Sequence, residues 1–346
     1  MRYILLFIAC MLLEGLQAQS KYQEEQVSIP VEDFQLAGTL SMPKNAKKVP
    51  AVILITGSGP QNRDSDILGF KMFAQIAEAL NAQGIAVLRC DDRGVGASTG
   101  SLAEATTAHL VQDTWALFRY LQTRPEIDPK RIGLYGHSEG AAIASILAAY
   151  HPEIAWIVLA GGSGVSGADL LLEQNRLIGK ASGLSEEQLT QARAFNQKAY
   201  ETVLSSKRDW EALEKAFQAL LPPGVPEAQA KAIFQQQKAA LESPWIEYFL
   251  GLNPAEQLAR VKCPALLLFG ELDLQVPPAQ NEAPMKAALQ KAGNKNVESR
   301  VFTGANHLFQ NAKTGLPNEY ATLEKQFTEG FLDYLGAWVR KQSFKK

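Results

Sequence analysis

The stretch Ile132-Gly-Leu-Tyr-Gly-His-Ser-Glu-Gly-Ala-Ala-Ile-Ala-Ser-Ile-Leu-Ala-Ala-Tyr150 decides the fold of this 346-residue chain. Its first four residues, Ile132 to Tyr135, are typical of a short buried strand. The alanine-rich part from Ser138 to Tyr150 favours a helix. Between them, Gly136-His137-Ser138-Glu139-Gly140 matches the pattern G-x-S-x-G, in which glycines leave room for a sharp strand-to-helix turn. We therefore predict that Ser138 is an exposed nucleophile at this turn.

Apolar runs of the same kind recur on both sides of this stretch. We expect further buried strands at residues 51–55, 85–88, 157–160, 265–269 and 297–302. Helical patterns run over about residues 70–83, 107–122, 280–291 and 320–340. Residues 26–43 hold two alternating runs around a short turn, which predicts a β-hairpin. Strands that alternate with helices in this order predict an α/β fold with a mostly parallel sheet.

The segment from Gly164 to Gln257 interrupts this alternation. It contains no convincing strand and is rich in Ala, Gln, Glu, Leu and Lys, which are good helix formers. Because the sheet pattern continues on both sides, we predict a helical cap (residues 164–257) inserted into one core (residues 20–163 and 258–346), rather than a separate domain. Within it, an aromatic cluster either lines an acyl pocket or packs the cap onto the core; its members are Trp245, Tyr248 and Phe249.

A serine hydroxyl is a weak nucleophile and needs a base within hydrogen-bond reach. In sites built on such a turn, the chain order is serine, acid, histidine. Of the four histidines, only His307 leaves room for an acid between itself and Ser138. His137 should point away from the site, and His109 and His151 lie on helices, where they suit the surface or packing.

Asp273 is the acid that we expect to orient His307, because it follows the strand at residues 265–269. Glu271 in the same loop is the weaker candidate. The tetrahedral intermediate also needs backbone donors for its oxyanion. We expect these to be the N–H of Glu139, directly after the nucleophile, and the N–H of Ser58 in the loop Thr56-Gly57-Ser58-Gly59.

The N-terminus departs from the ordinary globular composition of the rest. Arg2 precedes an almost wholly apolar segment, Tyr3 to Leu13, and small or polar residues follow. This layout is typical of a secretory signal peptide (residues 1–19), and the run is too short to span a bilayer. We expect cleavage and an exported protein, periplasmic or extracellular; an uncleaved anchor is the alternative. Cys10 follows a poor lipoprotein signal, so we expect no lipid anchor there.

Composition excludes several classes of function. The formal net charge is −2 and no basic stripe stands out, which argues against a nucleic-acid interface. No Cys/His cluster has the spacing of metal ligands, so we predict neither a metal nor an organic cofactor. Cys90 and Cys263 fall at opposite ends of the predicted parallel strands, and we expect no disulfide between them.

Taken together, five stretches resemble the α/β-hydrolase family, and they are similar above all to bacterial esterases of the serine-aminopeptidase and dienelactone-hydrolase-like branch. The stretches are Gly57 to Asp64, Asp91 to Ser98, the motif around Ser138, Gly270 to Pro278, and Asn306 to Gln310. The resemblance implies an eight-stranded, mostly parallel sheet and a helical cap after the sixth strand. Many members have His-Gly at the oxyanion loop, whereas this chain has Thr56-Gly57.

We therefore expect a serine esterase that acts on a small-molecule ester with a short acyl chain through an acyl-enzyme. Three alternatives remain: an exported serine aminopeptidase on the same fold, a thioesterase, and a non-catalytic binding protein. An aminopeptidase needs an acidic subsite for the substrate amine, and export argues against a thioesterase because acyl-CoA is intracellular. The complete set of Ser138, Asp273 and His307 argues against a binding protein.

Overall fold

The computed structural model describes residues 22–222 and 224–345. The predicted signal peptide (residues 1–19) lies outside these residues. Within the described ranges, no helix is both long and apolar enough to cross a membrane. The thiols of Cys90 and Cys263 are free.

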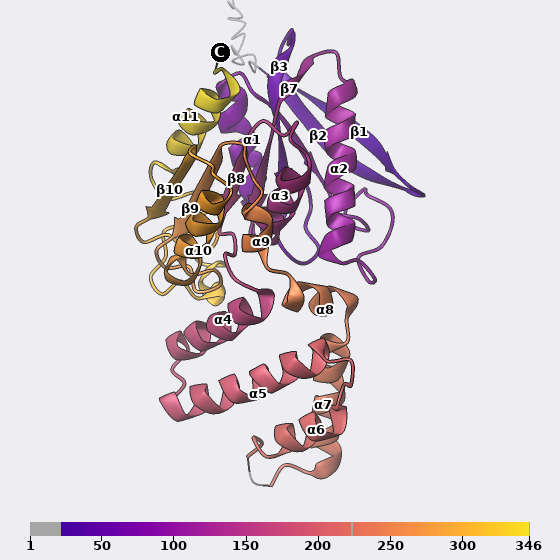
Figure 1. Ribbon diagram of the computed structural model, residues 1–346, viewed down its shortest axis with the longest axis vertical. Coiled ribbons are helices and arrows are strands. Elements are labelled where there is room, and N and C mark those ends of the chain that lie inside the picture. Colours follow the sequence, from indigo (N-terminus) through magenta and orange to yellow (C-terminus); the bar gives the residue numbers. More distant parts are fainter. Residues whose placement is uncertain (1–21, 223, 346) are drawn as a thin grey trace, which may run out of the picture.

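An eight-stranded sheet forms the centre of the molecule (Figure 1). Its strands, in chain order, are β1 (Tyr22–Val31), β2 (Phe34–Pro43), β3 (Val49–Ile55), β6 (Ala86–Cys90), β7 (Ile127–His137), β8 (Ile157–Ala160), β9 (Ala265–Gly270) and β10 (Val297–Phe302). They lie side by side in the order β1-β2-β6-β3-β7-β8-β9-β10. The hairpin β1–β2 is antiparallel, as is the pair β2–β6, and all the other pairs are parallel. The predicted hairpin and mostly parallel sheet are confirmed. A separate small hairpin joins β4 (Asp66–Ile67) to β5 (Phe70–Lys71).

Helices cover both faces of the sheet, because side chains of the central strands are buried alternately on each side. In β3, Ala51, Ile53 and Ile55 belong to one apolar core, whereas Val52 and Leu54 belong to the other. The first core also takes side chains from α2 (Thr107–Thr123), α3 (Glu139–Tyr150), α9 (Pro254–Leu258) and α10 (Pro278–Lys291). The second core packs α1 (Met72–Ala82) and α11 (Phe331–Ser343) against the opposite face.

A helical cap lies between β8 and β9, after the sixth strand of the large sheet, and projects from one end of it (Figure 1). Its helices are α4 (Gly167–Ala181), α5 (Glu186–Leu204), α6 (Trp210–Gln218), α7 (Glu227–Leu241) and α8 (Pro244–Gly251). They share a small apolar core of their own, which includes Tyr200, Phe217 and Phe234. The chain enters and leaves the cap at adjacent points, where the N–H of Gly167 donates to the carbonyl oxygen of Leu252 at 2.9 Å.

The last helix is shorter than predicted. Only Phe331–Ser343 is α-helical, and the chain before it holds a single 3-10 turn at Pro317–Glu319. Gly330 adopts a left-handed conformation (φ 75°), so a helix cannot run through it from residue 320. Tyr320 and Phe327 are nevertheless buried, which explains why the apolar spacing of this irregular segment looked helical. The prediction of a helix over residues 320–340 is therefore wrong in its first half.

Candidate active site

Three predicted residues lie at one edge of the sheet. Ser138, Asp273 and His307 follow β7, β9 and β10, whose carboxyl ends meet there because these strands are parallel. The N–H of Ser138 donates to the carbonyl oxygen of Ala160 at 2.9 Å. Gly161, the residue after Ala160, packs closely against the His307 ring. A Cβ on Gly161 would lie 3.1 Å from Cε1 of His307. Gly161 was not among the predicted site residues, although Gly161-Gly162 after a strand is a signal of close backbone approach.

Ser138 has the backbone conformation of a strained turn. Its φ is 55° and its ψ is −119°, values that a residue with a side chain rarely adopts. Both flanking glycines are needed at this turn. A Cβ on Gly136 would lie 2.1 Å from the carbonyl oxygen of Gly140, and a Cβ on Gly140 would lie 2.3 Å from that of Ile55. The turn holds the serine at the start of α3, where the helix dipole favours negative charge.

Asp273 and His307 form a buried hydrogen-bonded pair. Nδ1–H of His307 donates to Oδ2 of Asp273 at 2.7 Å. The other oxygen of Asp273 accepts hydrogen bonds from the N–H groups of Gln275 and Val276, both at 2.8 Å. Because a carboxylate can only accept, the neutral His307 ring carries its hydrogen on Nδ1 and leaves Nε2 free to take a proton. The Ser138 hydroxyl makes no hydrogen bond to any described residue, and such contacts often form only in the substrate complex.

His137 supports the loop that carries His307. Its ring is buried, and Nε2–H donates to the backbone carbonyl of His307 at 2.9 Å. Burial and the neighbouring His307 lower the pKa of His137 to about 3, so the ring is neutral. The carbonyl acceptor therefore fixes the hydrogen of His137 on Nε2.

The remaining candidate base and acid residues lie elsewhere. His109 caps the start of α2, where its Nδ1 accepts from the N–H of Thr106 at 3.0 Å. His151 stacks on Trp115 with ring centroids 3.7 Å apart. Glu271 accepts from the N–H of Gly304 at 2.9 Å, while Asp273 bonds His307. The geometry thus favours Asp273 over Glu271 as the partner of His307.

A cavity of about 160 Å³ opens beside Ser138. Both residues that we expect to donate to the oxyanion, Ser58 and Glu139, line it together with Ser138. The N–H groups of Ser58 and Glu139 donate to no other described residue. Most of the wall is apolar and comes largely from the cap; its apolar residues are Ala142, Val165, Leu170, Leu171, Trp245, Phe249, Leu252, Pro254 and Val276.

The predicted aromatic cluster is only partly at this cavity. Trp245 and Phe249 line it with their rings stacked, 4.9 Å apart at an interplanar angle of 17°. They are four residues apart on α8 and therefore share one face of the helix. Tyr248 lies outside the lining and is 38% exposed.

The side chain of Glu139 connects the nucleophile turn to the cap. Its Oε1 accepts hydrogen bonds from the Thr107 hydroxyl at 2.6 Å and from Nε1–H of Trp245 at 2.9 Å. Burial raises the pKa of Glu139, and the two hydrogen bonds oppose that rise. The sequence analysis had assigned a role only to its backbone N–H.

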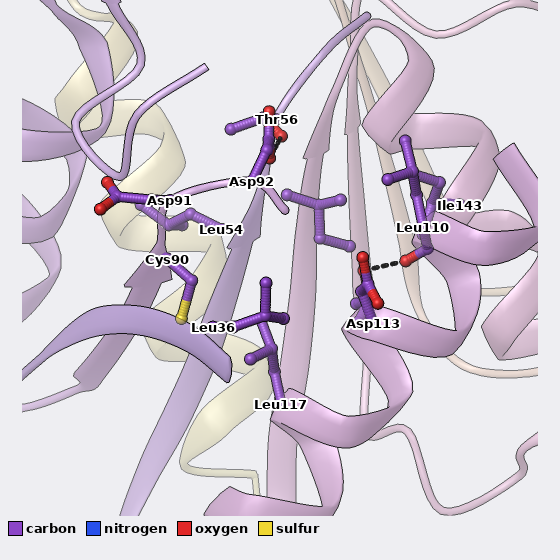
Figure 2. A pocket seen from close by; sticks show the side chains of 12 residues that line it. Leu36, Leu54, Thr56, Cys90, Asp91, Asp92, Leu110, Asp113, Leu117 and Ile143 are labelled. Carbon is purple, nitrogen blue, oxygen red and sulfur yellow. Dashed lines mark hydrogen bonds between the residues drawn. The ribbon is translucent and has the colours of Figure 1, made fainter. Parts of the chain in front are cut away.

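Asp92, which follows β6, lies behind the loop that contains Ser58. Its carboxylate accepts from the Thr56 hydroxyl at 2.6 Å and from the N–H of Gln61 at 2.9 Å. Figure 2 shows Asp92 beside Thr56 at one end of a small cavity of about 40 Å³, with Asp113 of α2 further along it. Burial raises the pKa of Asp92 to about 7, helped by the negative charges of Glu139 and Asp113. The described residues contain no cluster of His, Cys, Asp and Glu that could hold a metal ion.

Known proteins resemble this chain both in sequence and in fold. The family model described as serine aminopeptidase, S33, matches residues 70–208, and that of the prolyl oligopeptidase family matches residues 230–332. Esterase EstD of Thermotoga maritima is 27% identical over 312 residues, which cover 88% of this chain and 66% of EstD. The chain thus spans just under two thirds of the length of that relative.

Solved structures share the fold. An esterase of Pyrococcus furiosus superposes with a TM-score of 0.55 at 20% identity, covering 93% of this chain and 90% of that one. A proline iminopeptidase of Mycobacterium smegmatis gives a TM-score of 0.56 at 18% identity, covering 92% of this chain and 99% of that one. With its strained serine turn and its capped, mostly parallel sheet, the chain has the α/β-hydrolase fold.

Proposed function

We propose that this protein is a serine esterase that hydrolyses carboxylic esters with short acyl chains. The observation that carries the proposal is the arrangement at the edge of the sheet. A serine on a strained turn lines a mostly apolar cavity, and a buried Asp273–His307 pair lies at the same end of the sheet. Similarity to esterase EstD of Thermotoga maritima supports the same reaction.

The proposed reaction assigns each step to a named residue. Oγ of Ser138 bonds to the ester carbonyl carbon and its proton passes to Nε2 of His307, while the carbonyl π electrons move to oxygen. The N–H groups of Ser58 and Glu139 hold this oxyanion. The intermediate then collapses, the bond to the alkoxy oxygen breaks, and the departing alcohol takes the proton from His307. Water repeats the sequence on the acyl-enzyme, releasing the acid and restoring Ser138.

The lining of the cavity favours binding of an uncharged acyl group. Its apolar wall and its volume of about 160 Å³ suit a short alkyl or aryl chain beside the stacked rings of Trp245 and Phe249. An aminopeptidase, the second candidate, is favoured by the serine aminopeptidase match at residues 70–208. It would need an acidic group for the substrate amine. The acidic residue in the described lining is Glu139, whose carboxyl group already accepts hydrogen bonds from Thr107 and Trp245.

A substrate panel with one active-site variant tests the proposal. The wild type should hydrolyse p-nitrophenyl acetate and butyrate faster than the palmitate ester, and faster than aminoacyl p-nitroanilides. Ser138→Ala should lower kcat by at least about 10⁴-fold with an unchanged circular-dichroism spectrum. Faster cleavage of the anilides would favour the aminopeptidase, and substantial turnover by Ser138→Ala would refute the nucleophile assignment.

A further inference from the structure

The loop from Thr56 to Gln61 packs directly against the nucleophile. A Cβ on Gly57 would lie 3.1 Å from Cβ of Ser138, so the backbone of the loop approaches the serine closely here. Ser58, the next residue, lines the cavity beside Ser138. The position of this loop therefore decides where the Ser58 N–H lies relative to the oxyanion.

Asp92 holds both ends of that loop. One carboxylate oxygen accepts from the Thr56 hydroxyl at 2.6 Å, and the other accepts from the N–H of Gln61 at 2.9 Å. The backbone N–H of Asp92 also donates to the carbonyl oxygen of Gln61 at 3.1 Å. Because Asp92 follows β6 and Thr56 follows β3, these bonds tie the carboxyl ends of two neighbouring strands together (Figure 2).

We propose that Asp92 is a positioning residue of the active site, which fixes the Thr56–Gln61 loop and thereby aims the Ser58 N–H at the oxyanion. This inference rests on the proposed function, because it assigns a task within the same reaction. Asp92 acts through the loop and does not line the cavity beside Ser138.

Hydrogen bonding, rather than charge, is what this task requires. The Thr56 hydroxyl can either donate or accept, whereas the Gln61 N–H can only donate. An ionised Asp92 accepts from both groups. A protonated Asp92 can accept from Gln61 and donate its proton to Thr56. Asparagine offers the same pair, a carbonyl oxygen for Gln61 and an amide N–H for Thr56, so Asp92→Asn should keep the loop in place.

Steady-state kinetics on four variants test this. Asp92→Ala should lower kcat on p-nitrophenyl butyrate by about 10- to 100-fold with KM within about twofold, since a misplaced oxyanion donor weakens only the transition state. Asp92→Asn should restore kcat to within about threefold of the wild type. Thr56→Val, which removes one of the two loop contacts without changing shape, should fall between them. Asp113→Ala is the matched control, because Asp113 lines the same small cavity but bonds Arg93, not the loop.

A transition-state analogue separates positioning from general loss of structure. A butyl trifluoromethyl ketone forms a tetrahedral adduct with Ser138 and places an oxyanion between Ser58 and Glu139. Across the variants, its inhibition constant should rise in parallel with the fall in kcat/KM, while the inhibition constant of butyrate stays constant. Melting curves confirm that each variant is folded at the assay temperature.

Each outcome decides between the proposals. If Asp92→Ala retains kcat within about threefold, or if Asp92→Asn is as impaired as Asp92→Ala, the positioning role is wrong. Should Asp92→Ala fail to fold, Thr56→Val decides: full activity and unchanged inhibition by the ketone overturn the inference. Ester turnover in the wild type together with an unaffected Asp92→Ala would overturn this inference alone. A wild type without turnover and without labelling of Ser138 by a fluorophosphonate would overturn the proposed function as well.

Discussion

Replacing Asp92 by asparagine should stabilise the protein at alkaline pH but not in acid. The pKa of Asp92 rises from an ordinary 3.8 to about 7, mainly because of burial. The folded protein therefore binds this proton more tightly than the unfolded chain, and the free energy of unfolding falls as the pH rises from about 4 to about 7. Above pH 7 the difference corresponds to about 4 kcal/mol. The Asp92 side chain is partly accessible to solvent, which screens its charge. We therefore expect a smaller loss in the free energy of unfolding, ~2 kcal/mol.

Asparagine does not titrate, and it can keep the bonds to Thr56 and Gln61. Urea unfolding followed by tryptophan fluorescence should therefore give Asp92→Asn a free energy of unfolding about 2 kcal/mol above the wild type at pH 8. At pH 4.5 the two proteins should differ little. Asp113→Asn is the contrasting control, because it leaves the Arg93 guanidinium without its carboxylate and should destabilise at pH 8. Equal stability of Asp92→Asn and wild type at pH 8, or a gain that is independent of pH, would refute the reasoning.

Two further substitutions test the packing and the histidine loop. Gly133→Ala should lower the free energy of unfolding by about 1–3 kcal/mol, visible as a lower Tm, because its Cβ would lie 2.2 Å from the buried Trp156 ring; an unchanged Tm would contradict this packing. His137→Phe should lower kcat by about tenfold or more with little change in KM, since the His307 loop loses its 2.9 Å hydrogen bond, while His137→Gln, which can still donate, should recover part of the activity. Equal kcat values for these two variants would argue against that role.

The fold was predictable because its signals are local. Buried parallel strands appear as short apolar runs such as Ala51 to Ile55, and the cap appears as a long segment without strands. The final helix was misjudged because Tyr320 and Phe327 are buried without being helical, and the conformation of Gly330 could not be inferred from spacing. The spacing of these apolar residues therefore suggested a helix that the backbone does not form.

The candidate site likewise contains residues that were predictable from the sequence and contacts that were not. Ser138 was identifiable from the five residues around it, and His307 by elimination among four histidines. The contacts that surround them join residues far apart in the chain: His137 meets a backbone carbonyl 170 positions later, and Trp245 meets Glu139 from 106 positions away. No local pattern encodes such pairs, because they depend on how the loops at the sheet edge pack together.

The adjacent entry and exit of the cap have a consequence for how chains of this fold can vary. Gly167 and Leu252 are joined by a backbone hydrogen bond, so the chain enters and leaves the cap at one place on the core. We therefore expect that lengthening, shortening or replacing the segment between them would leave the ends of β8 and β9 in place. The cap supplies Trp245 and Phe249 to the cavity wall, whereas Ser138 belongs to the core. If the cavity binds the acyl group as proposed, replacing the cap should therefore change the acyl preference and leave the position of Ser138 unchanged.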